Sequence, residues 1–264
     1  MPRSHTRLAR IATLDGPRWV TIENERLYTL AGSPYDRWEQ GAEIGSLAAA
    51  SLLAPAAPSK IIYVGRNYPA HAAEHSAEVP SEPLLFFKPP SSLIGPGDPI
   101  TLTPQSSRVE HEAELALVIG RRCRRVTPEK AWQAVLGITC ANDVTARDLQ
   151  RQDKLWTRAK GFDTFCPLGP WIVTGVTEQD AADLQVTCRV NGEIRQQGRT
   201  SEMVFSPAQL IAYISSIMTL KPGDLLLTGT PAGVGPLAAG DTVEVEIETV
   251  GVLHNPVRDS EEDA

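Results

Sequence analysis

The chain has 264 residues and 42% hydrophobic content, enough for a large core in one or two domains. A net charge of −7 argues against nucleic-acid binding, which needs a basic surface, and the one basic cluster, RRCRR at 121–125, is typical of a solvated turn. With no run of about 18 apolar residues, no signal-peptide pattern and four scattered cysteines, we expect a reduced, cytoplasmic protein that does not enter a membrane.

The first part of the chain predicts short strands. Residues 8–30 contain strand-forming runs separated by the turn sequences Asp15-Gly16-Pro17 and Glu23-Asn24. Residues 46–59, SLAAASLLAPAAPS, have the composition of a domain boundary. We therefore expect a small β-rich N-terminal domain over residues 1–55, a main domain over 56–257 and a disordered acidic tail over 258–264.

The segment NYPAHAAEH, residues 67–75, predicts a short helix that begins at Asn67 or Pro69. His71, Glu74 and His75 would share one face, because residues three and four apart are neighbours on a helix. The pattern fits a zinc site of one peptidase class, a proton-transfer pair or an ordinary amphipathic helix. The residues of this segment alone do not decide between the three.

Three glutamates mark the next candidate site. Buried strands are predicted at IIYVG (61–65) and LLFFKP (84–89), and a further strand at HEAELALVIG (111–120). Because strand side chains alternate, Glu110, Glu112 and Glu114 fall on one face. Carboxylates in an apolar strand are costly unless their charge is compensated, and a divalent cation would compensate them; an edge strand with a wet face is the alternative. Oxygen ligands favour magnesium, manganese or calcium over zinc.

Asp143 offers a third carboxylate. It follows the apolar run VLGITCAN and lies either at a strand end or at the N-cap of a helix predicted near Thr145. On that helix Arg147 and Gln150 would point the same way as Asp143. A guanidinium and an amide beside a metal suit a substrate carboxylate, and a solvated helix face is the alternative.

Two lysines and a glycine-rich segment complete the candidates. Lys160, in RAKGFDTFCPLGP, and Lys88, at the end of LLFFK, fit either site or surface positions. The segment TLKPGDLLLTGTPAGVGPLAAGD lacks phosphate-loop and dinucleotide signatures. It predicts a tight loop whose amides and Thr230 hydroxyl approach a small anion, or a turn between strands. Cys166 has no identifiable base nearby in the sequence, so we expect it to serve packing.

The remaining pattern is β-rich. Helices are predicted near Thr127 and over 206–218, where Ser206 suits the N-cap and Pro207 the first position. The sequence GDTVEVEIETVGVLHNPV alternates with a period of two and predicts a strand pair or one curved strand. Strands dominate, so we expect a β-rich α+β domain and not a doubly wound sheet.

Six stretches together resemble the fumarylacetoacetate hydrolase family, in its branch of fumarylacetoacetate hydrolase domain-containing proteins. They occur in the family's order over about residues 60 to 250: VGRNYPAHAAEH, SEPLLFFKP, VEHEAELALVIG, ANDVTARDLQ, WTRAKGFDTFCPLGPWI and GDLLLTGTPAGVG. The resemblance implies a mixed β-roll, a small N-terminal domain like that of many bacterial members, and a homodimer.

The resemblance also implies roles for single residues. It assigns Mg²⁺ or Mn²⁺ to three ligands, Glu112, Glu114 and Asp143, and leaves Glu110 outside them. It implies no organic cofactor. It implies a catalytic dyad of His71 and Glu74 on a helix (68–78) that orders over the substrate, so that zinc is not needed and His75 is a surface residue. Lys160 matches a catalytic position, and five residues match positions near or in contact with the substrate: Arg66, Lys88, Arg147, Gln150 and Thr230. The segment between Gln150 and Lys160 is shorter than in animal members, which bears on substrate fit.

The activity implied first is metal-dependent cleavage of a carbon–carbon bond in small 2,4-dioxo acids such as acylpyruvates. His71 would activate water, Lys160 would stabilise an oxyanion, and the products would be pyruvate and a carboxylic acid, formed through a metal-bound enolate. Oxaloacetate decarboxylation and isomerisation of 2-hydroxyhepta-2,4-diene-1,7-dioate in aromatic catabolism share this enolate and stay open. A non-catalytic oxo-acid-binding relative is the alternative of another class, and the presence of every site residue argues against it.

Overall fold

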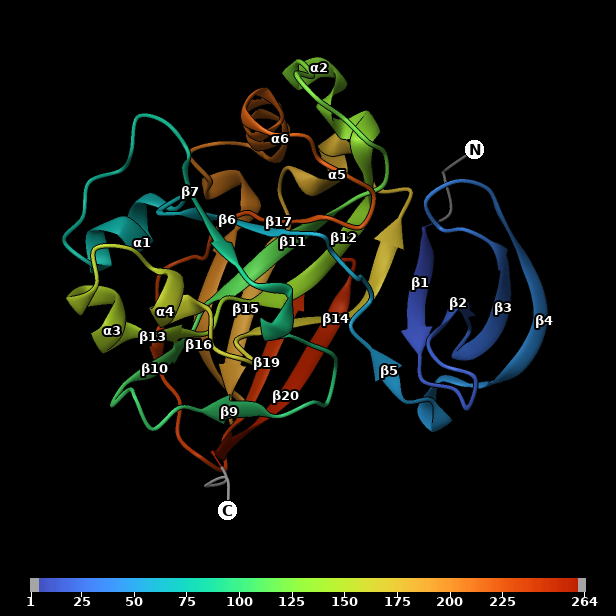
Figure 1. The fold of residues 1–264 in the computed structure, drawn as a ribbon, viewed down its shortest axis with the longest axis horizontal. Coiled ribbons are helices and arrows are strands. Elements are labelled where there is room, and N and C mark those ends of the chain that lie inside the picture. Colours follow the sequence, from blue (N-terminus) through green and yellow to red (C-terminus); the bar gives the residue numbers. More distant parts are fainter. Residues whose placement is uncertain (1–4, 261–264) are drawn as a thin grey trace.

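The computed structural model describes residues 5–260. The N-terminal part is an antiparallel arrangement of short strands, which confirms the strands predicted over 8–30: β1 (Thr6–Ile11), β2 (Arg18–Glu23), β3 (Arg26–Gly32), β4 (Trp38–Ser46) and β5 (Leu52–Leu53), with a 3-10 turn at Leu47–Ala49. Asn24 and Glu25 have positive φ values of 48° and 60°, as a two-residue hairpin turn requires. Figure 1 shows these blue strands at one side of the molecule.

The main part of the chain contains fifteen strands and six α-helices within the described residues. The strands are β6 (Ile61–Gly65), β7 (Leu84–Lys88), β8 (Leu93–Ile94), β9 (Ile100–Leu102), β10 (Val109–His111), β11 (Ala113–Ile119), β12 (Val135–Asn142), β13 (Thr145–Ala146), β14 (Cys166–Thr174), β15 (Gln185–Val190), β16 (Glu193–Arg199), β17 (Leu225–Leu227), β18 (Gly235–Pro236), β19 (Thr242–Ile247) and β20 (Gly251–Asp259). The helices are α1 (Pro69–Glu74), α2 (Pro128–Ala131), α3 (Arg147–Gln152), α4 (Thr157–Lys160), α5 (Glu178–Ala181) and α6 (Pro207–Ile217), with 3-10 turns at Pro90–Ser92, Trp132–Ala134 and Thr200–Glu202. Most helices are a turn or two long, as a β-rich α+β fold predicts.

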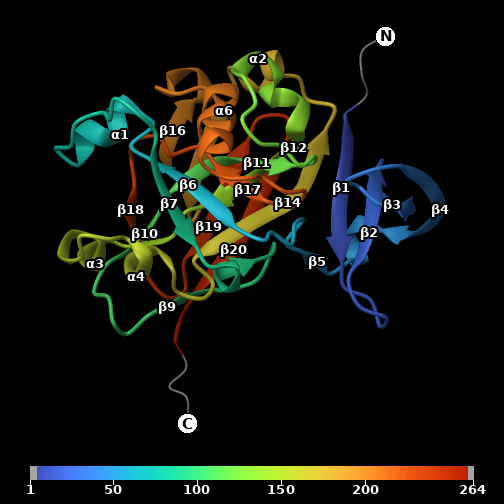
Figure 2. The same ribbon diagram turned by 45° about the horizontal axis from the view of Figure 1, so that its top comes forward.

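The strands form three sheets. The largest has twelve strands in the order β4-β3-β2-β1-β14-β12-β11-β17-β6-β7, with β5 beside β1 and β8 beside β14. A five-stranded sheet follows the order β16-β15-β19-β20-β9, and a three-stranded sheet the order β13-β10-β18. The large sheet is mixed because β17 and β6 pair in parallel, and the five-stranded sheet because β20 and β9 do. The N-terminal strands join the main sheet through β1 and β14, which Figure 2 shows side by side.

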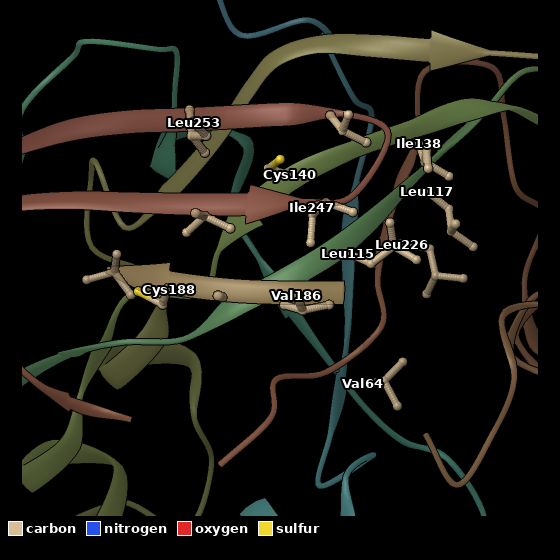
Figure 3. Packing of buried hydrophobic residues seen from close by; sticks show 14 of the residues in the cluster. Val64, Leu115, Leu117, Ile138, Cys140, Val186, Cys188, Leu226, Ile247 and Leu253 are labelled. Atoms are coloured by element: carbon tan, nitrogen blue, oxygen red, sulfur yellow. The ribbon is translucent and has the colours of Figure 1, made fainter. Parts of the chain in front are cut away.

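The core lies between the large sheet and the five-stranded sheet. Strand β11 is buried along its whole length, because β12 and β17 flank it and β15 and β19 cover it. Figure 3 shows side chains of β15, β19 and β20 directed toward those of β11 and β12: Val186, Cys188, Ile247, Leu253, Leu115, Leu117, Ile138 and Cys140. A close-packed core of this kind holds its strands rigidly. Strand β11 therefore gives a rigid base to the carboxylates at its start.

Of two helix N-caps predicted from the sequence, one is confirmed and one is wrong. The predicted cap of α6 is confirmed, because the Ser206 hydroxyl accepts a hydrogen bond from the Gln209 amide and the Gln209 side chain accepts one from the Ser206 amide. Asn67 is not a helix cap, since Tyr68 holds that position in α1; the Asn67 side chain is buried and bonds the Phe205 amide and the Thr228 carbonyl.

The C-terminal hairpin of β19 and β20 confirms the predicted strand pair. The predicted tail begins too early, because β20 includes Arg258 and Asp259; residues 261–264 of that tail lie outside the described residues. Among residues 5–260 no helix has the length and apolar character needed to cross a bilayer.

Candidate active site

Three buried carboxylates meet at the start of β11. Glu112 precedes β11, Glu114 is its second residue, and Asp143 follows the last residue of β12. Because Ala113 pairs with Asn142 across these antiparallel strands, Asp143 comes beside Glu112, and its amide donates to the Glu112 carbonyl at 2.8 Å. The three side chains are 1–3% exposed, and each offers a ligand atom within 4.8 Å of the others. The predicted triad is thus assembled, whereas the alternative of Asp143 as a helix N-cap is wrong, because α3 starts after Ala146.

Two buried lysines contact the triad. The Lys160 ammonium donates to Glu112 Oε2 at 2.8 Å and to Asp143 Oδ2 at 2.5 Å. The Lys88 ammonium lies 2.6 Å from Asp143 Oδ1 and donates to the carbonyls of Val144 and Phe165. Both side chains are at most 3% exposed, so the alternative of surface lysines is wrong.

Arg147 connects the triad to Glu110. Its Nε donates to Glu110 Oε2 at 2.6 Å, and its two other nitrogens bond Glu112 Oε1 and the Gln150 side chain. Glu110 also accepts a hydrogen bond from Arg108, so its charge is compensated without a metal.

The carboxylates of the triad differ in charge balance. Burial opposes ionisation of Glu112, but Lys160 and Arg147 outweigh it and hold its pKa well below the usual value. Burial, together with the charges of Asp143 and Glu112, raises the pKa of Glu114 well above its usual value. Burial also raises the pKa of Asp143 despite its lysine neighbours. Two of three clustered acids therefore lack sufficient positive charge around them.

The triad fits a hard divalent cation. Asp143 Oδ1 is buried and accepts no well-oriented hydrogen bond from the described residues, although Lys88 is near. Glu114 Oε2 accepts the Gly229 amide at 2.8 Å, which holds the carboxylate in place. Gly229 has φ of 101°, and a Cβ there would come within 2.8 Å of the Asn67 Cβ, so this close approach requires glycine. Oxygen ligands at this spacing are those that Mg²⁺ and Mn²⁺ prefer.

A histidine and a glutamate of α1 reach the same cavity. His71 is 7% exposed, and its Nδ1 lies 3.4 Å from Glu74 Oε2. The Gly233 amide donates to both Glu74 oxygens, at 3.1 and 3.3 Å. Burial lowers the pKa of His71. The charges of Arg147 and Lys160 lower it further, whereas those of Glu112 and Glu74 raise it, and the net lowering favours the neutral imidazole. His75, predicted as a surface residue, is half-buried, and its Nε2 is buried.

The predicted side chains line one cavity of about 460 Å³. Its wall includes the triad, His71, Glu74, Lys160 and four of the five residues predicted to contact or adjoin the substrate: Arg66, Arg147, Gln150 and Thr230. The fifth, Lys88, stands behind Asp143 and does not line the cavity. Phe86 and Trp156, which pack edge to face with ring centroids 5.2 Å apart, add an aromatic wall.

Some site residues were absent from the prediction. Gln196 of β16 is buried, accepts hydrogen bonds from the Ala113 amide, and donates to Thr230 Oγ1 and the Pro231 carbonyl. It thereby joins the glycine-rich loop to the start of β11. No strand was predicted over residues 193–199, so Gln196 had no sequence signal, and neither had Arg151, which lines the cavity.

The cavity of this β-rich fold combines a buried carboxylate triad, one buried lysine, Lys160, and a histidine. This combination is typical of metal-assisted enzymes that act on small molecules. The family model described as fumarylacetoacetate (FAA) hydrolase C-terminal matches residues 60–258, and the one described as Rv2993c-like, N-terminal matches residues 6–55. The chain belongs to the fumarylacetoacetate hydrolase family, as the six sequence stretches predicted.

Named relatives extend over most of the chain. Protein Rv2993c of Mycobacterium tuberculosis is 46% identical over 258 residues, covering 95% of this chain and 97% of that protein. The mitochondrial oxaloacetate tautomerase fahd2 of Xenopus laevis is 48% identical over 217 residues, covering 78% of this chain and 68% of that protein. The crystal structure of a 2-hydroxyhepta-2,4-diene-1,7-dioate isomerase from Mycobacterium marinum is 44% identical, with a TM-score of 0.89, covering 97% of this chain and all of that one.

Proposed function

We propose that this protein is a Mg²⁺- or Mn²⁺-dependent enzyme that moves a proton on a small 2-oxo dicarboxylate and interconverts its enol and keto forms. The observation that carries the proposal is a buried imidazole, His71, which lies 3.4 Å from Glu74 Oε2 and shares one cavity with the carboxylate triad. A neutral base beside a Lewis-acid site is what proton abstraction next to a carbonyl needs. The names of the frog tautomerase and the mycobacterial isomerase support the same chemistry.

The cavity wall supports a substrate with two carboxylates. Arg66 and Arg151 line it, and within residues 5–260 neither side chain makes a hydrogen bond or an ion pair. Guanidinium groups bind carboxylates in a two-pronged fork. One end of the substrate would face the triad and the other these arginines, which favours oxaloacetate-like and longer dioates over monoacids.

In this mechanism Glu112, Glu114 and Asp143 would hold the divalent ion, which supplies a Lewis acid toward the 2-oxo group when bound. His71 takes the proton from the enol hydroxyl or from carbon 3 and returns it to the other position, so the net change is one proton shift. Glu74, fixed by the Gly233 amide, orients the imidazole. Gln150 and Thr230 donate hydrogen bonds to the substrate's oxo-acid end.

Hydrolysis of acylpyruvates is the second candidate, and the His71–Glu74 pair is the observation that favours it. A histidine oriented by a carboxylate can take a proton from water, whose oxygen then attacks the 4-oxo carbon. The bond between carbons 3 and 4 breaks, and carbon 3 gains the proton to give pyruvate and a carboxylic acid. Lys160 would stabilise the oxyanion. Oxaloacetate decarboxylation needs no activated water, so it would not require His71.

The test compares three substrates on metal-stripped protein with added Mg²⁺: enol-oxaloacetate, acetylpyruvate and 2-hydroxyhepta-2,4-diene-1,7-dioate. Wild type, His71→Ala and the control His254→Ala, which removes an exposed imidazole on β20, are assayed side by side. The proposal expects rapid ketonisation or isomerisation in wild type and the control, and a loss of about 10²–10⁴-fold in His71→Ala. Pyruvate release from acetylpyruvate that depends on His71 would replace it with the hydrolase. Oxaloacetate decarboxylation at equal rates by wild type and His71→Ala would show that His71 is not the base. Oxalate binding without turnover of any substrate would make the protein a non-catalytic relative.

The homodimer and the cytoplasmic location stay predictions. So does closure of the 68–78 segment over the substrate.

A further inference from the structure

Helix α1 and its C-cap carry a second group of metal-ligating side chains, separate from the triad. His71, Glu74 and His75 each offer one ligand atom, and these atoms lie within 4.8 Å of one another. The two imidazoles are four residues apart, and their ring centroids are 4.8 Å apart in an edge-to-face arrangement. Histidines at this spacing on one helix face can bind one ion together.

Both imidazoles keep a buried nitrogen without a partner. Nδ1 of His71 and Nε2 of His75 are buried and make no hydrogen bond to the described residues. Leaving a buried polar atom unpaired is costly, because it has lost its hydrogen bonds to water. Two such atoms on residues whose ligand atoms lie within 4.8 Å of one another and of the Glu74 carboxylate indicate a missing shared ligand.

The distances suit a tetrahedral ion. His71 Nδ1 lies 3.4 Å from Glu74 Oε2. Zinc bonds of about 2.0–2.1 Å at tetrahedral angles place neighbouring ligand atoms about 3.3 Å apart. The Gly233 amide already fixes the Glu74 carboxylate, so His75, at the helix C-cap, is the ligand that must move closer.

We propose that His71, Glu74 and His75 bind a transition-metal ion such as Zn²⁺, and that this ion inhibits the enzyme by occupying His71. Imidazole ligands select zinc and similar ions, whereas the all-oxygen triad selects Mg²⁺ or Mn²⁺, so one cavity holds two sites of different metal preference. The fourth position stays open to water. Binding of the ion does not depend on the proposed function; inhibition rests on it.

The binding test titrates Zn²⁺ by calorimetry into full-length protein saturated with Mg²⁺. Wild type and the control His254→Gln should each bind one equivalent tightly. His75→Gln should lose at least about 100-fold in affinity, since even loss of a metal ligand's outer partner costs 10–100-fold. Circular dichroism verifies that the variants are folded. Equal Zn²⁺ affinity in wild type and His75→Gln, or release of one Mg²⁺ per Zn²⁺ bound, would overturn the site.

The activity test adds Zn²⁺ to Mg²⁺-saturated enzyme with enol-oxaloacetate. One equivalent should stop turnover by wild type and His254→Gln. The variant His75→Gln should keep the basal rate and resist Zn²⁺ at concentrations about 100-fold higher. Equal inhibition of His75→Gln would overturn the regulatory part even if binding is confirmed. Absence of any turnover without Zn²⁺ would refute the proposed function alone, because calorimetry still decides the site.

Discussion

Replacing Lys88 with methionine tests whether the triad is a site of incompletely compensated negative charge. The Lys88 ammonium is buried, lies 2.6 Å from Asp143 Oδ1 and donates to the carbonyls of Val144 and Phe165 at 2.9 and 2.6 Å. Methionine keeps the volume and removes the charge. Removing one partner of a buried ion pair costs about 3–5 kcal/mol. The raised pKa of Asp143, caused by burial, lets this carboxyl take up a proton, which keeps the cost at the lower end of that range.

A bound divalent cation should offset much of this loss. In wild type, Mg²⁺ at 100 times its dissociation constant stabilises the folded state by about 2.7 kcal/mol. The increment should be larger in Lys88→Met at the same ratio of Mg²⁺ to the wild-type dissociation constant, because the ion replaces the missing positive charge beside Asp143.

The assay is urea unfolding of wild type, Lys88→Met and Lys154→Met, each in chelator and in Mg²⁺. Lys154 is exposed, so its replacement should change stability by less than about 0.5 kcal/mol. A loss below about 1 kcal/mol in Lys88→Met, or an Mg²⁺ increment equal to that of wild type, would refute the reasoning.

Three further predictions follow from the site and its supports. Because burial and nearby cations lower the pKa of His71 and the neutral imidazole is the base, kcat/KM should fall with decreasing pH only below about pH 6.5, as a pH–rate profile would show; an acidic limb above that value would contradict this. Arg151→Met should raise KM for oxaloacetate by about 10-fold or more in steady-state kinetics, whereas the control Arg121→Met should leave this KM unchanged; an unchanged KM in Arg151→Met, or an equal rise in the control, would contradict the role of Arg151 in binding the distal carboxylate. Ser206→Ala should cost about 1 kcal/mol of unfolding free energy in urea through the lost α6 cap, and no change would show that this cap contributes nothing.

Signals confined to one segment predicted structure well. Ser206-Pro207 defined the start of α6, because a cap and the residues that complete it lie within one helical turn. The alternation of residues 242–257 predicted the β19–β20 hairpin. The spacing of Glu112 and Glu114 placed both on one face, since a strand alone fixes that relation.

Features set by distant segments were not predictable in this way. Lys88 appears in the sequence as a plain strand end, and its burial depends on the carbonyls of Val144 and Phe165 from other parts of the chain. Asn67 resembled a cap, but contacts with residues more than a hundred positions away determine its role.

Strand β14 shows the limit of local rules. Its two prolines, Pro167 and Pro170, argue against a strand in the middle of a sheet, yet β14 lies between β1 and β12. The pairing with β12 shifts register between Ile138 and Cys140, opposite the stretch that contains Pro170, so the ladder does not need the amide that Pro170 lacks. Pro167 lies at the start of β14, where the strand pairs with the two-residue strand β8. Cys166 at its start is buried, and burial raises its pKa to about 11, in keeping with the predicted packing role.

The central claim is that the triad binds a divalent ion needed for turnover. The most direct test measures Mn²⁺ binding through the loss of the electron paramagnetic resonance signal of the free ion. Metal-stripped wild type should bind one Mn²⁺ per chain in competition with Mg²⁺ and regain turnover of enol-oxaloacetate. Burial and acidic neighbours raise the pKa of Glu114 well above its usual value. Replacing this carboxylate in Glu114→Gln should weaken Mn²⁺ binding by at least about 100-fold and abolish the regained turnover. Equal Mn²⁺ binding by the two proteins, or full turnover without any divalent ion, would contradict the account.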